Sequence, residues 1–300
     1  MKRRDFLKWT ALSSAGLALP CGLAALGRMA HAARGPDLVV ARGTSTPQTV
    51  RAALDALGGM KRFVAAGDVV VLKPNIGWDR APQYAATTNP DVVGALAKLC
   101  YEAGAKKVRI FDNPVNDARR CYRQSGIADA AATAGAEMVY MDGRKYRDVR
   151  LDGKALKSWP LYGEIFEADK VINVPVAKTH GLSGLTLGMK NWMGIMGGAR
   201  FRVHQRLDES LVDLVRVIRP ALTVLDAVRI LTANGPTGGD LSDVKRLDTV
   251  VAGTDQVAVD SFGATLFGMK GSEIGSVRLA ANAGLGVMDL SKLQIKRIGV

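Results

Sequence analysis

The 300-residue sequence predicts an α/β fold, with a largely parallel or mixed sheet covered by helices on both faces. The first reason is that short apolar runs recur along the chain, each followed by a stretch with helical periodicity. The second is the way they connect. In "EAGAKKVRIFDN" a helical stretch ends at Gly104 and a new apolar run begins four residues later, which is typical of helix–strand units on a parallel sheet.

These runs and stretches alternate from one end of the chain to the other. The polar stretch 143–157 is expected to form a hairpin or an excursion from the sheet. Because no repeat or low-complexity linker divides the chain, residues 33–300 are expected to form a single domain. The expected strands are 38–41, 69–72, 108–111, 138–141, 171–174, 222–225 and 249–252. The expected helices are 46–57, 90–103, 127–134, 207–218, 256–267 and 273–283.

Local residues support the boundaries of two helices. Asn89 suits the N-cap of helix 90–103, and Pro90 suits its first position. Either Thr254 or Asp255 is expected to cap helix 256–267 in the same way.

Asp260 falls inside that second helix, among Ala and Val residues, where a carboxylate needs a polar partner such as a lysine of the site. We therefore expect Asp255 and Asp260 to play structural, supporting roles.

Residues 1–32 have the features of an export signal. The start "MKRRDFLKW" contains paired arginines followed by Asp-Phe-Leu-Lys and is similar to a twin-arginine signal. An apolar stretch and an Ala-His-Ala cleavage site follow, while an ordinary secretory signal or a retained anchor is the alternative. We expect export by the twin-arginine translocase, cleavage, and a soluble periplasmic protein with no stable membrane span.

The chain is strongly basic, with a formal net charge of +13. Five basic residues and one acidic residue lie in 1–32, which leaves the remaining residues at +9. The sequence has no zinc-finger, helix-turn-helix or aromatic-rich basic motif, so no nucleic-acid partner is expected. The excess charge is either a solvated surface or an electropositive pocket for a small anionic molecule.

Three cysteines occur, and one of them lies in the predicted signal. Cys100 shares a helical apolar stripe with Val93 and Leu96, which predicts a core position, whereas Cys121 lies in a polar stretch. Whether the two pair stays open. Two cysteines cannot hold a four-cysteine cluster, so no iron–sulfur cluster is expected from this chain alone, and the cofactor is unknown.

Polar residues end four of the expected strands, as in "VVVLKPN", "VRIFDNP", "VINVPVAKTH" and "LTVLDA". In open α/β sheets, ligands bind outside the carboxyl ends of the strands. The alternative is that these are ordinary turn-forming residues. We favour a shared site. The residues concerned are Lys73, Asn75, Asp112, Asn113, Lys178, Thr179, His180 and Asp226.

The segment "NVPVAKTHGLSGLTLGMKNWMGIMGG" (173–198) contains six glycines. Gly costs about 1 kcal/mol relative to Ala inside a helix, so the glycines serve either close packing or backbone amides that face a ligand. Its methionines are expected to fill the core. Lys190 and Asn191 interrupt the apolar face and are expected to bind the ligand.

Two histidines lie outside the predicted signal. His180 follows a strand and precedes the glycines, so it is a candidate acid, base or ligand. His204 lies in the basic stretch "ARFRVHQR", which is either solvated or clamps a carboxylate or phosphate.

The sequence contains no P-loop, dinucleotide fingerprint, nucleophile elbow or His-x-x-x-His motif. A metal held by Asp112, Asp226 and Asp260 together with His180 is a further hypothesis.

"LKPNIGW", "TTNPDVVGAL", "NVPVAKTHGLSGLTLGMKNWMG" and "TDQVAVDSFGA" together resemble the family called domain of unknown function 362, in the family's order and over about 40–268. The resemblance implies no particular activity. Many members carry an added ferredoxin-like cysteine module, which this sequence lacks. The positions that match the family's motifs are Lys73, Pro74, Asn75, Lys178, Thr179, His180, Lys190, Asn191, Asp255 and Asp260.

These observations predict a basic site for a small carboxylate or phosphate, formed at the strand ends by lysines and asparagines. His180 would carry the proton, and Asp112 or Asp226 would be the opposing carboxylate. Crowded lysines lower one another's pKa, so one of Lys73, Lys178 and Lys190 is a candidate general base, and Lys178 is counted among the catalytic candidates. The alternative is a non-catalytic accessory or binding protein that serves the assembly of an exported redox system.

Overall fold

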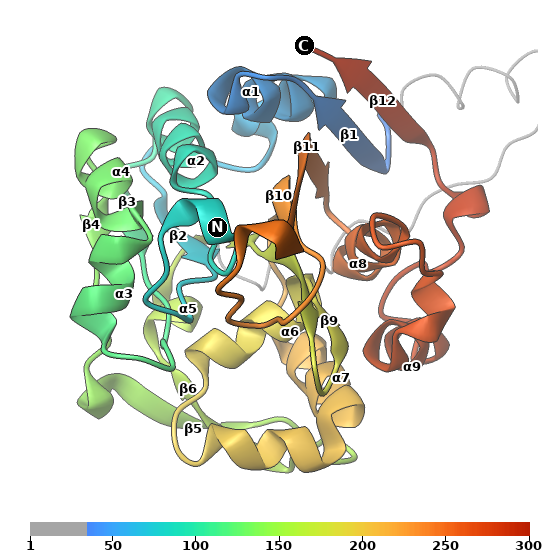
Figure 1. Cartoon of the computed structure of the whole chain (residues 1–300). Helices are drawn as coiled ribbons and strands as arrows, with labels where there is room; N and C mark the ends of the chain where they lie inside the picture. The colour runs from blue at the N-terminus through green and yellow to red at the C-terminus, as the bar shows by residue number, and fades with distance from the viewer. Residues whose placement is uncertain (1–34) are drawn as a thin grey trace, which may run out of the picture. The chain divides into compact units, whose positions relative to one another are not determined.

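Eight strands lie side by side in the main sheet of the computed structural model, which describes residues 35–300 (Figure 1). The predicted export signal at 1–32 lies outside these residues. In spatial order the strands are β12 (Ile295–Gly299), β1 (Leu38–Arg42), β11 (Val244–Gly253), β10 (Leu222–Leu231), β7 (Lys170–Val174), β2 (Val69–Pro74), β3 (Lys107–Ile110) and β4 (Glu137–Met138). Neighbours are parallel, except that β11 runs against both β1 and β10. The predicted, largely parallel α/β sheet is therefore confirmed.

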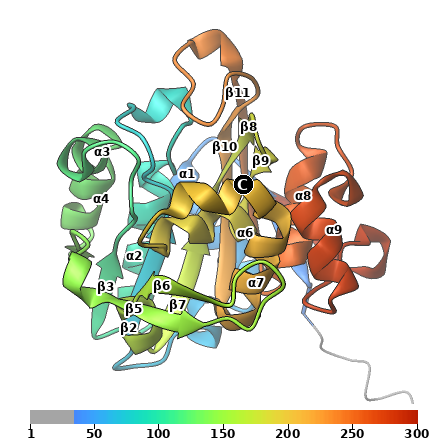
Figure 2. The same ribbon diagram turned by 90° about the horizontal axis from the view of Figure 1, so that it is seen from below.

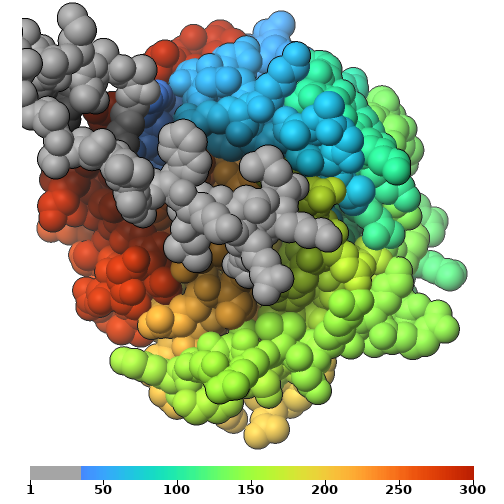
Figure 3. Space-filling model, turned by 180° about the vertical axis from the view of Figure 1, so that it is seen from behind, coloured from blue at the N-terminus to red at the C-terminus, as the bar shows by residue number. Residues whose placement is uncertain are grey.

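Four further strands lie beside or outside this row. β8 (Val176–His180) continues β7 after Pro175 and pairs with β10, and it turns back into β9 (Gly184–Thr186). β5 (Tyr146–Arg150) and β6 (Ser158–Tyr162) form a separate antiparallel hairpin, as the polar stretch 143–157 predicted. This hairpin lies across the outside of the described chain as a lime-green band (Figure 3).

Helices cover both faces of the sheet, as predicted (Figures 1 and 2). One face carries α1 (Thr46–Ala56), α2 (Pro90–Glu102), α3 (Ala118–Gln124) and α4 (Ile127–Thr133). The other carries α5 (Glu164–Glu167), α6 (Gly188–Asn191), α7 (Leu207–Val217), α8 (Gln256–Thr265) and α9 (Gly275–Asn282), together with the β5–β6 hairpin.

The central strands are buried on both faces, and β2 shows why its sequence is continuously apolar. Val71 packs into the core beneath α6–α9, whereas Val70 and Leu72 pack into the core beneath α1 and α2. All three side chains are fully buried. Alternate side chains of β2 face the two apolar layers, so none of these positions faces solvent. A half-exposed strand would instead have a polar residue at every second position.

Side-chain caps fix the starts of two helices. The Asn89 side chain accepts a hydrogen bond from Asp91 N at 2.9 Å, with Pro90 in the first turn of α2. Asp255 accepts from Val257 N and Ala258 N at 2.8 and 3.0 Å at the start of α8. Both caps satisfy backbone donors that the first helical turn leaves free.

Several expected boundaries differ from the structure. Of strand 138–141, only Met138 lies in the two-residue β4. Strand 222–225 is the start of the ten-residue β10, and strand 249–252 lies near the end of the ten-residue β11. The prediction missed β12, which is a half-exposed edge strand with charged residues and therefore no apolar run. It also missed β8, whose run is interrupted by Lys178 and His180.

Gly35–Val300 form one compact unit. Because β1 and β12 pair in parallel, the blue and red segments at its two ends meet (Figure 3). No helix within residues 35–300 combines the length and apolarity needed to cross a membrane.

Candidate functional site

A cavity of about 540 Å³ lies at the carboxyl ends of the central strands. After β2, the chain adds β3 to one side of that strand, and it later adds β7 to the other side. The direction in which strands are added to the sheet therefore reverses at β2. Open α/β sheets bind their ligands at such a point. The lining comes from the segments after β2, β3 and β10, from β8 and β9, and from residues 190–204.

Most of the predicted site residues meet at this cavity. Those that line it are Asn75, Asp112, Asn113, Lys178, His180, Lys190 and Asn191. They come from strand ends, loops and helix α6, and lie up to 116 residues apart in the sequence.

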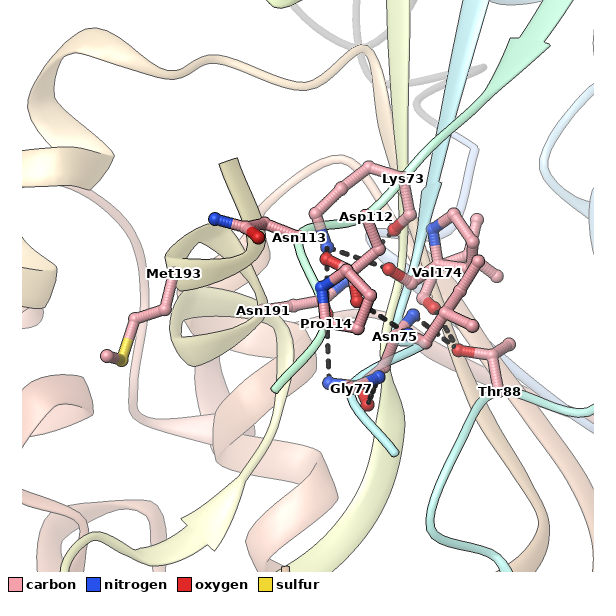
Figure 4. Close-up of polar contacts among 12 residues, drawn as sticks. Lys73, Asn75, Gly77, Thr88, Asp112, Asn113, Pro114, Val174, Asn191 and Met193 are labelled. Carbon is pink, nitrogen blue, oxygen red and sulfur yellow. Dashed lines mark hydrogen bonds and ion pairs between the residues drawn. The ribbon is translucent and has the colours of Figure 1, made fainter. Parts of the chain in front are cut away.

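Lys73 and Asp112 form a buried ion pair behind the cavity wall (Figure 4). Lys73 Nζ lies 2.8 Å from Asp112 Oδ1 and also donates to Pro74 O at 2.7 Å. Asp112 Oδ2 accepts from Ile76 N at 2.6 Å. Burial lowers the pKa of Lys73, and the Asp112 carboxylate opposes that shift. The pair therefore fixes Asp112 at the wall, while Lys73 itself does not line the cavity.

Asparagine side chains connect this pair to the neighbouring elements (Figure 4). Asn191 donates to Lys73 O at 2.9 Å and to Asn173 Oδ1 at 2.8 Å. Its own Oδ1 lies 3.3 Å from both Lys73 Nζ and Asn75 Nδ2. The network joins β2, β7 and α6, so Asn75 and Asn191 reach the cavity in fixed orientations.

Lys178 is 2% exposed, and its amine reaches the cavity from β8. Nζ donates to Asn75 Oδ1 at 3.1 Å and to Ala86 O at 2.5 Å. Burial, followed by the charge of Lys190, lowers its pKa to about 7. A neutral amine has two N–H bonds and one lone pair. Because two acceptors use both N–H bonds, the lone pair is left without a protein donor among the described residues.

Lys190 and Arg200 add positive charge that no nearby carboxylate balances. Within residues 35–300, no carboxylate oxygen lies within 4 Å of either cationic group. The guanidinium of Arg200 donates to the carbonyls of Asn113 and Pro114, and the side-chain contact of Lys190 is Met193 Sδ at 3.7 Å. Burial and the charge of Arg200 lower the pKa of Lys190 to about 8. The cavity is therefore electropositive.

Two histidine rings stack at one side of the cavity, with centroids 5.8 Å apart and an interplanar angle of 10°. His180 Nδ1 accepts from Leu182 N at 3.1 Å, which places the proton of the neutral ring on Nε2. Burial and Lys190 lower the pKa of His180 to about 3. His204 Nδ1 lies 3.1 Å from Phe201 O, and burial together with Lys190 lowers its pKa too.

One lining residue has an unused polar atom. Thr186 is 3% exposed, and its Oγ1 has no hydrogen-bond partner among the described residues. Buried hydroxyls are normally paired, so this one is available to a ligand.

Glycine is required at two positions because other groups approach its backbone closely. A Cβ atom at Gly194 would lie 1.7 Å from Asp112 Oδ1 and 2.6 Å from Lys73 Nζ. A Cβ at Gly188 would lie 2.8 Å from Asp260 Oδ1. These two glycines therefore serve close packing, which was one of the two interpretations of the glycine-rich segment.

Besides Lys73, four predicted site residues lie outside the cavity lining. Asp226 accepts from Asn89 N at 2.7 Å and Val228 N at 3.0 Å, on the side of the sheet that carries α2. The expectation that Asp226 opposes the proton carrier is therefore wrong, because alternation along β10 directs its carboxylate to the helix start. Thr179 Oγ1 accepts from Gly235 N at 3.3 Å.

Asp255 and Asp260 hold backbone instead. Besides capping α8, Asp255 accepts from Val287 N at 2.7 Å. Asp260 accepts from Gly188 N at 2.6 Å and Met189 N at 2.8 Å, so its partners are amides of α6 and not the lysine that the sequence suggested.

The hypothetical metal set is not assembled. Asp112, Asp226 and Asp260 bind different backbone segments, and no group of three or more His, Cys, Asp or Glu side chains in residues 35–300 is placed to hold a metal. Cys100 and Cys121 are buried free thiols.

Sequence reasoning gave no site role to Trp78 and left Arg200 and His204 undecided, yet all three line the cavity. The available signal was the basic stretch "ARFRVHQR" immediately after the glycine-rich segment. The sequence did not decide whether this stretch is solvated or binds an anion, because only long-range packing places it beside β8.

The chain matches a protein family and a known relative in sequence. Residues 70–265 match the family described as Domain of unknown function (DUF362). A thylakoid-associated protein of Synechocystis sp. is 33% identical over 221 residues, covering 71% of this chain and 67% of that protein.

Two solved structures are similar at lower levels. The lactate racemase apoprotein of Thermoanaerobacterium thermosaccharolyticum has a TM-score of 0.47 and 12% identity, covering 73% of this chain and 54% of that one. A protein of Thermotoga maritima has a TM-score of 0.40 and 9% identity, covering 79% and 59%. The chain thus spans less than two thirds of both solved structures. On the match to residues 70–265 and the cyanobacterial relative, the chain belongs to the DUF362 family.

Proposed function

We propose that this protein is an exported, periplasmic enzyme that binds a small carboxylate or phosphate in the cavity and transfers a proton to or from it. The observation that carries the proposal is Lys178, an almost fully buried amine with a pKa of about 7 at the floor of an electropositive cavity. Strongly shifted pKa values in a cavity are typical of catalytic acids and bases.

Lys190 and Arg200 bind the anion in this proposal, because neither cation has a carboxylate partner among the described residues. Thr186 Oγ1 and the amides of Asn75 and Asn191 supply hydrogen bonds that orient the anion. Lys73, by contrast, is neutralised by Asp112 and acts by positioning that carboxylate.

Neutral Lys178 is the general base, because its lone pair is the one tetrahedral direction that the bonds to Asn75 and Ala86 leave open. His180, neutral and protonated on Nε2, is the matching hydrogen-bond donor. A bound anion raises the pKa of Lys178 by adding negative charge, so the amine becomes a stronger base for a proton of the substrate; with a simple anion that supplies no such proton, Lys178 takes one from the solvent instead.

The experiment is calorimetric titration of the exported protein with inorganic phosphate and with acetate, in two buffers of different ionisation enthalpy. Binding is expected to take up protons at pH 7.5, because the anion favours the charged lysines. Lys178→Met is expected to remove most of that uptake, and the exposed Lys106→Met serves as the control for net charge. Failure of the wild type to bind either anion would contradict the proposed site.

Proton transfer is tested separately by incubating a panel of small 2-oxo carboxylates in D₂O and following hydrogen exchange by NMR. Wild type is expected to exchange at least one member faster than the Lys178→Met and His180→Gln variants.

The relative described as thylakoid-associated favours a second candidate. In it, this protein is a non-catalytic accessory or binding protein for an exported redox system. Native mass spectrometry with elemental analysis of the exported protein distinguishes the two. A bound small anion or metal supports the enzyme, whereas an empty protein in complex with a redox subunit supports the accessory role.

A further inference from the structure

Large apolar side chains gather around the mouth of the cavity. Val115, Leu182 and Phe201 are 60%, 72% and 73% exposed, and all three line it. They are three of the seven large apolar side chains that are exposed in residues 35–300. Single exposed apolar residues are ordinary, but their convergence on one opening is typical of a ligand site. The half-buried indole of Trp78 belongs to the same wall.

The floor of the same cavity has the opposite character. Lys178, Asp112 and Asn191 are each 2% exposed there, with Lys190 and Arg200 close by. The cavity therefore has a charged, hydrogen-bonding inner end and an apolar outer end formed by the segments after β2 and β3, the β8–β9 turn and residues 200–204.

Size separates the possible ligands. The cavity encloses about 540 Å³, which lies in the range of sites for organic ligands. One water takes about 30 Å³ in the liquid, so phosphate or acetate alone would fill only the inner end. Phe201 and Leu182 would then stay exposed around a water-filled opening.

We infer that the ligand is an amphipathic anion, in which a carboxylate or phosphate head is joined to an apolar, ring-bearing body. The head lies at Lys178, Lys190 and Arg200, and the body lies against Trp78, Leu182 and Phe201. The head position rests on the proposed function, whereas the body rests on the exposed apolar mouth. Covering these side chains removes apolar surface from water, and an aromatic body gains ring contacts with Trp78 and Phe201.

The test compares methylphosphonate with phenylphosphonate, which share one head group and resist hydrolysis. Calorimetry with the exported protein is expected to show phenylphosphonate binding about tenfold more tightly or better. A Leu182→Ser/Phe201→Ser double variant is expected to lose most of that gain while keeping its affinity for methylphosphonate. Phe166→Ser is the matched control, because Phe166 is 45% exposed on α5 and does not line this cavity.

Lys190→Met separates the two halves of the ligand, because it is expected to weaken both phosphonates by the same factor and leave their ratio unchanged. Equal affinity of the wild type for both phosphonates overturns the inference while the proposed anion site stands. A phenyl gain that survives in the double variant also overturns it, because the body then lies elsewhere. If neither phosphonate binds, the proposed function fails and the inference falls with it.

Discussion

Lys73 Nζ lies 2.8 Å from Asp112 Oδ1, with both side chains almost completely shielded from solvent, at the joint between β2 and β3. Breaking one partner of such a buried pair typically costs about 3–5 kcal/mol, because the other charge stays buried and unpaired. Lys73→Met and Asp112→Asn are each expected to lower the free energy of unfolding by an amount in that range. The double variant is expected to cost less than the sum of the two, which urea denaturation of all four proteins measures as a coupling energy.

The space for this pair depends on Gly194. A Cβ there would lie 1.7 Å from Asp112 Oδ1, so Gly194→Ala must displace the ion pair or the backbone. We expect a loss of about 2 kcal/mol or more in the free energy of unfolding. Gly143→Ala is the control, since a Cβ at Gly143 meets nothing within 4 Å. Similar losses in both variants would show that the close approach to Asp112 does not matter.

The stability of the protein is expected to depend on the titration of Lys178. Its pKa falls from 10.5 to about 7 on folding, so between these values the unfolded chain holds a proton that the folded chain lacks. The free energy of unfolding therefore rises with pH from about 7 to 10.5, with a slope of up to about 1.4 kcal/mol per pH unit from this group.

Urea denaturation across this pH range measures the slope, and Lys178→Met is expected to flatten it. The exposed Lys106→Met variant should keep the slope of the wild type. A slope that is unchanged in Lys178→Met would mean that Lys178 stays charged when folded.

Anion affinity is expected to fall as pH rises through about 8, where Lys190 loses its proton. Sulfate is the suitable probe, because its own charge is constant over this range. Calorimetric titrations from pH 6.5 to 9.5 should show a strong decrease for wild type, and weaker binding with a smaller decrease for Lys190→Met, in which Lys178 still loses its proton near pH 7. Undiminished binding at pH 9.5 would exclude Lys190 as the main anion contact.

His180 is expected to stay neutral and to carry its proton on Nε2 down to about pH 4, since burial and Lys190 lower its pKa to about 3. Long-range ¹H–¹⁵N spectra report both the tautomer and the titration of each ring, and His204→Gln assigns the signals. A midpoint near 6.5 for His180 would contradict the neutral donor assigned to it.

The sequence alone determined the layered fold and the end of the sheet at which the site lies. Apolar runs such as 69–72 must be buried on both faces, and parallel strands place their polar ends at one edge. For this reason the sequence alone points to Asn75, Asp112, Lys178 and His180, all of which line the cavity.

Only the tertiary structure decided which polar residues share the cavity. The side chain of a strand residue points to one face or the other, and this sends Asp226 to the start of α2 while Lys178 reaches the cavity. Packing also brings His204 against His180 and neutralises Lys73 with Asp112. These contacts join residues far apart in the chain, so local sequence patterns do not determine them. The same long-range packing buries the lysines and thereby lowers their pKa values.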